Sequence, residues 1–356
     1  MTDTHRRAMT AIAVLFLVPT LTACVSVTAT PAAGGYQPYA PAVVSEEVAL
    51  RDTFDSSAPE THDYWSNPDM FADADGMNFT DPDNGITVGA SDPATGAYFP
   101  PTTPTPAAES TNGYGDIAQA QQYDRGGLGA STFGRLYMAF NGHNGVCSAT
   151  VVNSSRGDIV VTAAHCLMDL SGDRSTPQNV VFVPGDAGNA QTQPYGQWAA
   201  VEYLMPQNFV DNAHVEASGS VTGAGWTTDF AFLIMEEKNG QSIQDVTGGQ
   251  GISFGVPVQA ITQIGYPTAE PFDGTDEFVC ASTSWTQSFA GGYSHPCDMT
   301  PGCSGGGWLA YFDRTLGAGY IIATTSTVSL SGTPTTSGSP LGKQALELYE
   351  QADAKQ

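Results

Sequence analysis

The feature that most constrains this chain is a serine set among glycines in residues 301–307, which read Pro-Gly-Cys-Ser-Gly-Gly-Gly. Glycine reaches backbone conformations that other residues avoid, and it lets another main chain approach closely. A serine flanked by glycines is therefore typical of a sharp turn that presents a nucleophilic hydroxyl group. The same pattern also occurs in ordinary loops of glycine-rich chains. Ser304 is a candidate nucleophile only if a base and an acid accompany it elsewhere in the sequence.

Two further motifs supply that base and that acid. Residues 162–166, Thr-Ala-Ala-His-Cys, follow an apolar run and place His165 just after an expected strand. Residues 229–235, Asp-Phe-Ala-Phe-Leu-Ile-Met, place Asp229 directly before another one. The competing acids of this region, which lead into no apolar run of similar length, are Asp186, Glu202 and Asp211. The order His, Asp, Ser predicts a triad in which Asp229 orients His165 and His165 is the general base for Ser304.

With these motifs the chain resembles the trypsin-like (chymotrypsin-fold) serine peptidases, and more closely their secreted bacterial branch, which is related to the glutamyl endopeptidases. The resemblance covers roughly residues 130–350. It implies an all-β fold of two packed antiparallel six-stranded β-barrels with a C-terminal helix. We expect that helix to begin near residues 338–340, Gly-Ser-Pro, and to pack against the second barrel.

The resemblance also implies a mechanism. Ser304 would attack the scissile carbonyl and form an acyl-enzyme, and the backbone N–H groups of Gly302 and Ser304 would form the oxyanion hole. No metal or organic cofactor is expected, because this mechanism requires none. Cys303 replaces the aspartate of the usual Gly-Asp-Ser-Gly-Gly-Pro motif, so the zymogen switch of the animal digestive enzymes is not expected here.

Six cysteines, one of them Cys24, point to disulfides and hence to a compartment outside the cytoplasm. The resemblance pairs Cys147 with Cys166, which would brace the loop after the catalytic histidine. Cys280 with Cys297 is the second expected pair. The cysteine of the serine motif is then the odd thiol, although it could instead pair with either member of the second pair.

Substrate preference is the least constrained feature. Asp298 lies six residues before Ser304, at the offset where trypsin-like enzymes place the carboxylate that binds Arg or Lys. By resemblance, the pocket-edge strand that pairs with the substrate backbone holds Thr325, Ser326 and Thr327. Glutamyl endopeptidases use a histidine on this strand, and Thr325 stands at that place, so a preference for Glu is not supported. We expect a preference for Arg or Lys, with a merely capped or solvent-facing Asp298 as the alternative.

The first 24 residues have the pattern of a lipoprotein signal peptide. A basic stretch at residues 5–7 precedes the apolar run 8–18, which is too short for a membrane span. Residues 21–24, Leu-Thr-Ala-Cys, match a lipobox, so Cys24 is predicted to be acylated and to anchor the protein at the outer face of the bacterial cell membrane. An ordinary signal peptide, followed by secretion, is the alternative.

Residues 25–125 are rich in Pro, Ala, Thr, Ser, Asp and Gly, and are predicted to be a mobile tether or a poorly ordered propeptide. The acidic stretches at 73–76 and 81–85 are interpreted as solvated turns, because they lack the spacing of a calcium loop. Residues 126–356 form the expected peptidase domain. The Arg-Gly-Gly at 125–127 would suit cleavage by a trypsin-like activity, including the protein's own.

The charge excludes one class of partner. A formal net charge of -25, from 11 Lys plus Arg and 36 Asp plus Glu, leaves almost no basic surface for a phosphate backbone, so nucleic acid is not expected to bind. The leading hypothesis is a monomeric serine endopeptidase that acts on proteins or peptides and contacts the membrane only through its lipid anchor. The alternative is a catalytically silent relative that binds peptides or proteins through the same cleft. The presence of every triad residue favours the enzyme.

Overall fold

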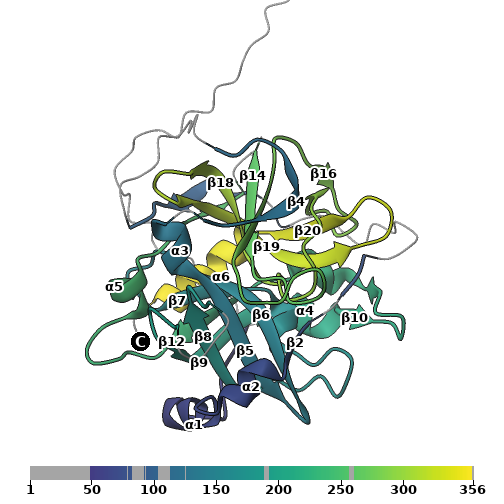
Figure 1. The fold of residues 1–356 in the computed structure, drawn as a ribbon. Helices are drawn as coiled ribbons and strands as arrows, with labels where there is room; N and C mark the ends of the chain where they lie inside the picture. Colours follow the sequence, from purple (N-terminus) through teal and green to yellow (C-terminus); the bar gives the residue numbers. More distant parts are fainter. Residues whose placement is uncertain are drawn as a thin grey trace, which may run out of the picture. The chain divides into compact units, whose positions relative to one another are not determined.

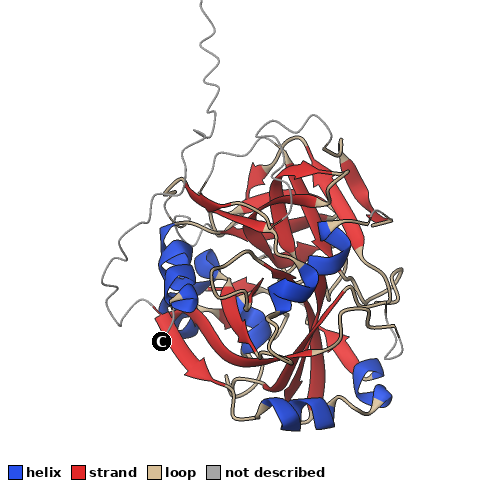
Figure 2. Ribbon diagram, turned by 90° about the vertical axis from the view of Figure 1, so that its left-hand side faces the viewer, coloured by secondary structure: helices blue, strands red, loops and turns tan. Residues whose placement is uncertain are grey.

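The computed structural model describes residues 49–77, 79–81, 92, 94–102, 113–124, 126–187, 192–255 and 260–354 of the 356. All of them fall within the unit Tyr39–Gln356. The predicted leader, Cys24 and Arg125 lie outside the described residues. No described helix is long and apolar enough to cross a membrane. Figure 2 shows that strands dominate the fold and that the helices are short.

Six strands of the first half close into a barrel. They follow the order β9-β12-β7-β6-β5-β8, and β8 also pairs with β9, which completes the ring (Figure 1). The sequence forms strands here because short runs of Val, Ile, Leu and Phe are separated by polar, glycine-containing turns. The strands are β5 (Phe133–Phe140), β6 (His143–Val151), β7 (Ile159–Thr162), β8 (Gln178–Pro184), β9 (Trp198–Pro206) and β12 (Ala231–Met235). The apolar runs at 135–140, 146–151 and 159–162 thus lie in β5, β6 and β7.

The second half is a larger sheet in the order β16-β17-β20-β19-β18-β14-β15-β4, with β13 paired to β19 and β3 paired to β13. It has ten strands rather than the expected six, partly because β3 (Ala97–Phe99) and β4 (Ile117–Gln122) are added from the N-terminal region. The remaining strands are β13 (Gly251–Phe254), β14 (Ile261–Gly265), β15 (Phe278–Ser282), β16 (Thr286–Gln287), β17 (Tyr293–Pro296), β18 (Gly307–Asp313), β19 (Ala318–Ser329) and β20 (Thr335–Pro340).

The C-terminal helix exists, but two details of its prediction are wrong. Residues 338–340 belong to β20, and α6 spans Lys343–Asp353. The carboxylate of Asp92 provides the N-terminal cap by accepting hydrogen bonds from the N–H groups of Gly342, Gln344 and Ala345 at 3.0–3.1 Å. The helix contacts β9 and β12 of the first barrel, besides β13, rather than the second sheet alone. A cap supplied from a distant part of the chain explains why no local capping residue marks the helix start.

The N-terminal region is folded wherever it is described, so the prediction of an unstructured tether over 25–125 is wrong for those residues. It contains β1 (Ala49–Thr53) on β9, α1 (Ala58–Tyr64), α2 (Pro68–Ala72) and β2 (Ala74–Gly76), which runs parallel to β6. Isolated aromatic residues anchor it, since Phe54, Trp65 and Phe79 are at most 8% exposed. Average composition hides such anchors because they are few and widely spaced. The remaining short elements are α3 (Leu128–Thr132), α4 (Gln207–Asn212), β10 (His214–Val215), β11 (Val221–Thr222) and α5 (Ile243–Thr247).

Candidate active site

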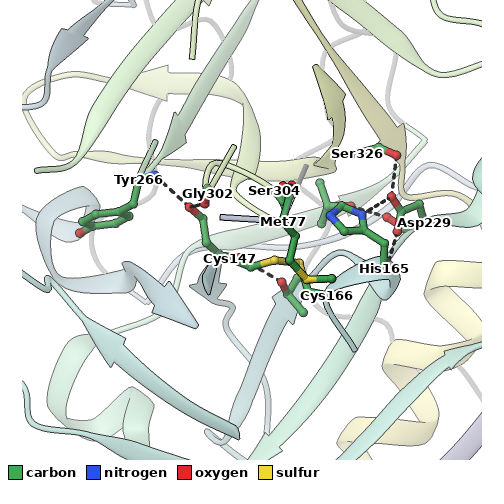
Figure 3. Close-up of a disulfide and its surroundings, with 12 residues drawn as sticks. Met77, Cys147, His165, Cys166, Asp229, Tyr266, Gly302, Ser304 and Ser326 are labelled. Carbon is green, nitrogen blue, oxygen red and sulfur yellow. Dashed lines mark hydrogen bonds and ion pairs between the residues drawn. A yellow bond between two sulfur atoms is a disulfide. The ribbon is translucent and has the colours of Figure 1, made fainter. Parts of the chain in front are cut away.

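The predicted base is held by a short turn and a disulfide. After β7, residues Ala164–Leu167 form one turn of 3-10 helix that carries His165, and the side chain of His165 is fully buried. The next residue, Cys166, is bonded to Cys147 of β6 at 2.08 Å (Figure 3). The bond ties the turn to the barrel wall directly beside the imidazole. Because both sulfurs are used in this bond, the grouping of Cys147, His165 and Cys166 within 4.8 Å offers no thiolate to a metal ion.

The predicted orienting acid is buried and receives three hydrogen bonds. Asp229 Oδ2 accepts from His165 Nδ1 at 2.7 Å and from Ser326 Oγ at 2.6 Å, and Oδ1 accepts from the His165 backbone N–H at 2.9 Å. Three donors from two directions fix the orientation of this carboxylate against the imidazole. When Nδ1 donates to this carboxylate, Nε2 is left with a lone pair, which is the tautomer that a general base requires.

The serine loop needs its glycines for reasons that the structure makes explicit. Gly302 has φ +100° and Gly305 has φ +77°, in the region that favours glycine. A Cβ on Gly305 would lie 2.2 Å from Thr162 Oγ1, and a Cβ on Gly302 would lie 2.6 Å from the Tyr266 carbonyl oxygen. These close approaches let the loop carrying Ser304 pass directly against both halves of the protein.

Ser148 of β6 fixes this loop from the first barrel, although no sequence motif points to this residue. Its N–H donates to the Ser304 carbonyl at 2.7 Å, and its Oγ donates to the Gly302 carbonyl at 2.9 Å. The same Oγ accepts from the Tyr266 N–H at 2.9 Å. No hydrogen bond between described residues uses the N–H groups of Gly302 or Ser304 themselves. Ser148 stands beside a cysteine in an apolar run, and nothing in that pattern indicates its role.

The loop of Ser304 lies against the residues just before His165, since a Cβ on Gly305 would lie 2.9 Å from the Ala163 nitrogen, but Ser304 and His165 are not hydrogen-bonded. Within the described part of the chain, His165 Nε2 is a buried nitrogen without a hydrogen-bond partner. Ser304 Oγ instead makes a long contact of 3.5 Å with the carbonyl oxygen of Met77. Ser304 is only 4% exposed. The constellation is therefore covered by the N-terminal region in this state.

The predicted substrate residues divide between several tasks. Ser326 donates to Asp229, as described above, and Thr327 Oγ1 donates to the Asp81 carboxylate. Thr325 is fully buried. Asp298 Oδ1 accepts from the Ala120 N–H of β4 at 2.6 Å. One oxygen of Asp298 is thus already used by β4, which corresponds to the capped alternative for this acid.

A buried polar cluster lies behind the pocket-edge strand, and no sequence motif indicated it. Thr325 Oγ1 accepts from Trp308 Nε1 at 2.9 Å and from Gln263 Nε2 at 3.1 Å. Gln263 Oε1 lies 2.9 Å from His295 Nε2 and accepts from Thr336 Oγ1 at 2.6 Å. Burial lowers the pKa of His295 to about 4, so this imidazole is neutral at ordinary pH. The cluster satisfies polar atoms that would otherwise be costly to bury.

The remaining cysteines form one bond and leave one thiol. Cys280 is bonded to Cys297 at 2.15 Å, and Cys303 is a free, buried cysteine. The structure thus contains neither alternative pairing of Cys303. Burial raises the pKa of Cys303 to about 12, so its side chain stays a neutral thiol at ordinary pH.

Among the comparisons with known proteins, only the search of solved structures gives matches. No protein-family model matches the sequence, and no curated protein matches it. The protease Anisep from Arthrobacter nicotinovorans does match in structure, with a TM-score of 0.52 and 28% identity over 66% of this chain and 100% of that one. This is the trypsin-like serine protease fold. A thermostable serine protease, AL20, from an extremophilic microorganism matches with a TM-score of 0.51 and 29% identity, over 64% of this chain and 98% of its own. Both trypsin-like relatives are proteases, which supports protease function in general for this chain.

Proposed function

We propose that this protein is a serine endopeptidase that hydrolyses peptide bonds through His165, Asp229 and Ser304. The observation that carries the proposal is the buried Asp229 carboxylate, whose three donors include His165 Nδ1. An arrangement of this kind holds one imidazole tautomer and stabilises the imidazolium that forms during catalysis. A histidine with a purely structural role would need neither a buried carboxylate on Nδ1 nor a nearby serine flanked by glycines.

The proposed reaction has two halves. Ser304 Oγ transfers its proton to His165 Nε2 and attacks the scissile carbonyl carbon, and the leaving amine then receives that proton. The resulting acyl-enzyme is hydrolysed by a water that His165 activates in the same way. The N–H groups of Gly302 and Ser304 are the proposed oxyanion donors, each contributing on the order of 3 kcal/mol to transition-state stabilisation. For this reaction Ser304 Oγ has to turn from Met77 toward His165.

Substrates are proposed to be proteins or peptides, with the Thr325, Ser326 and Thr327 strand at the pocket edge. A preference for Arg or Lys through Asp298 requires that carboxylate to be free of β4, so the structure gives this part of the hypothesis no support. The two disulfides favour a location outside the cytoplasm. Secretion with acylation at Cys24, and a monomeric state, remain proposals from the sequence.

Covalent labelling with a fluorophosphonate probe tests the proposed function. The full chain and the Ser304→Ala variant are treated before and after limited digestion with thermolysin, a metalloprotease that the probe does not label. Peptide mass spectrometry should place the adduct on Ser304 in the wild type and find none in the variant. A folded wild type that acquires no adduct before or after digestion would support the alternative, a silent domain that binds peptides through the cleft.

A further inference from the structure

We propose that residues 74–77 and 79–81, the cleft segment, form a built-in inhibitor that closes the active site until it is displaced or cut. This inference concerns the regulation of the site and rests on the proposed function. Residue 78, between the two ranges, lies outside the described residues.

The cleft segment is held by main-chain hydrogen bonds to both halves of the protein. On the barrel side, β2 (Ala74–Gly76) runs parallel to β6, and the Met77 N–H donates to the Val146 carbonyl at 3.4 Å. On the other side, the Phe79 carbonyl accepts from the N–H of Val328 of β19 at 3.1 Å. Thr80 adds a pair of hydrogen bonds with the loop around residues 219–221, at 3.1–3.2 Å. The segment therefore joins the two halves through the short strand β2 on one side and an isolated bridge between Thr80 and Val328 on the other. It takes main-chain groups that an extended substrate would need.

Gly76 and Met77 occupy the space around the nucleophile. A Cβ on Gly76 would lie 2.7 Å from the Gly302 nitrogen and 2.4 Å from Thr268 Oγ1. The Met77 carbonyl oxygen is 3.5 Å from Ser304 Oγ, and Figure 3 shows Met77 directly beside that serine. A substrate acyl group has to sit beside this same serine and the proposed oxyanion donor of Gly302. The two occupants exclude each other.

Phe79 covers the base. Its ring is 4.9 Å from the imidazole of His165 and 5.4 Å from the indole of Trp226, in edge and tilted arrangements. The phenyl group thus shields His165, which is fully buried in this state. A residue that binds protein substrates and exchanges protons with them must be reachable when the enzyme works.

The geometry at Ser304 explains why the segment inhibits instead of being cleaved. Attack requires the carbonyl carbon about 3–3.5 Å from Oγ, with the carbonyl oxygen on the oxyanion donors. Here the Met77 oxygen points at Ser304 Oγ as a hydrogen-bond acceptor. Ser304 Oγ thus contacts Met77, while His165 Nε2 has no hydrogen-bond partner among the described residues. Proton transfer to the base requires a hydrogen bond between Ser304 and His165, and that bond is not formed in this arrangement.

Asp81 latches the end of the segment, which corrects its interpretation as part of a solvated turn. Its carboxylate accepts hydrogen bonds from Thr327 Oγ1 and, at 3.0 Å, from Ser337 Oγ, on β19 and β20. Thr327 belongs to the predicted substrate strand, so the latch uses a residue assigned to substrate. Because two hydrogen bonds from hydroxyl groups hold this carboxylate, the segment can leave the cleft without the breaking of a covalent bond.

Gly76 offers a sharp test in the full chain. In Gly76→Val the added side chain has no room against the Gly302 main chain, so the segment should leave the cleft. Gly115→Val is the matched control, because a Cβ there meets nothing within 4 Å. We expect Gly76→Val to label with the fluorophosphonate at least about tenfold faster than both the wild type and Gly115→Val, because the labelling rate follows the fraction of open molecules. Measurable labelling of Ser304 at equal rates in all three proteins would overturn the inference and leave the proposed function standing.

Two further measurements separate inhibition from other causes. Asp81→Ala, which removes the latch without adding bulk, should also label faster than the wild type; an unchanged rate would count against the latch. Hydrogen exchange reports docking independently of chemistry: the Met77 and Thr80 amides should be protected in the wild type and exchange faster in Gly76→Val. Free exchange of these amides in the folded wild type would refute docking. Protection there, together with no adduct in the opened variants, would refute the peptidase proposal instead.

Discussion

Removing the Cys147–Cys166 disulfide should weaken both the fold and the catalytic base, and the second disulfide provides a matched control. The two bonds close loops of nearly equal length, with sequence separations of 19 and 17. The chain-entropy treatment assigns each about 3 kcal/mol of stability, and the two values differ by only about 0.1 kcal/mol. The double variants Cys147→Ala/Cys166→Ala and Cys280→Ala/Cys297→Ala should therefore lose similar free energies of unfolding.

Their activities should differ, because only one bond adjoins the base. His165 directly precedes Cys166 in the same 3-10 turn. We expect kcat to fall about tenfold or more without this disulfide, since small misplacements of catalytic groups are costly. The Cys280–Cys297 variant should keep kcat within about threefold, because that bond joins β15 to the residue after β17 and does not adjoin His165.

Stability is measured by urea unfolding followed by tryptophan fluorescence, on a Ser304→Ala background that prevents self-digestion. Activity is measured on a fluorescent casein with Ser304 restored, under the activation condition that gives the fastest labelling. Equal losses of stability with an unchanged kcat in the Cys147→Ala/Cys166→Ala variant would refute the argument that this bond positions His165. Clearly unequal losses of stability would refute the argument from loop length.

Three further predictions concern buried polar groups. Ser326→Ala removes one of the three donors to Asp229 and should lower kcat about 10- to 100-fold, the equivalent of roughly 1.5–3 kcal/mol for a hydrogen bond to a charged group. Ser326→Thr keeps a hydroxyl group and should retain most of the wild-type kcat. Steady-state kinetics on a peptide substrate test both variants. Burial lowers the pKa of His295 to about 4, so only the unfolded state binds a proton as the pH falls from about 6.5 toward 4. The free energy of unfolding should therefore drop by up to about 3 kcal/mol over that window. In urea unfolding, His295→Gln should make this free energy depend less steeply on pH. Burial raises the pKa of Glu277 well above its usual value, so folding stability is lost as the pH rises above about 4.5. Glu277→Gln should therefore unfold at a higher temperature than the wild type at pH 8. Equal unfolding temperatures in calorimetry would contradict this prediction.

The sequence predicted best what depends on local pattern. Short apolar runs between turn residues mark the strands at 159–162, 252–254 and 278–281, because a buried strand needs such a run. The neighbourhood of His165 and Asp229 was visible because each residue adjoins such a run. These features are written within a few consecutive residues.

The sequence failed where long-range contacts decide. Asp92 caps a helix that begins 251 positions later, at Lys343, and no local sequence pattern spans such a distance. Phe79 and Asp81 are ordinary in a polar segment, and only the three-dimensional structure shows that they contact His165 and Thr327. Asp298 was assigned to the substrate pocket by counting, but β4 comes from a region that was not expected to form strands.

The clamp of Ser148 on the serine loop has a consequence for biosynthesis. Ser304 lies in the second half of the chain, yet its loop takes its shape from hydrogen bonds to a residue of the first barrel. A molecule in which only one half has folded therefore lacks an assembled nucleophile. Peptidase activity would arise only in chains whose two halves have both folded and docked. A partly folded chain would therefore be unable to cleave neighbouring copies that are still folding.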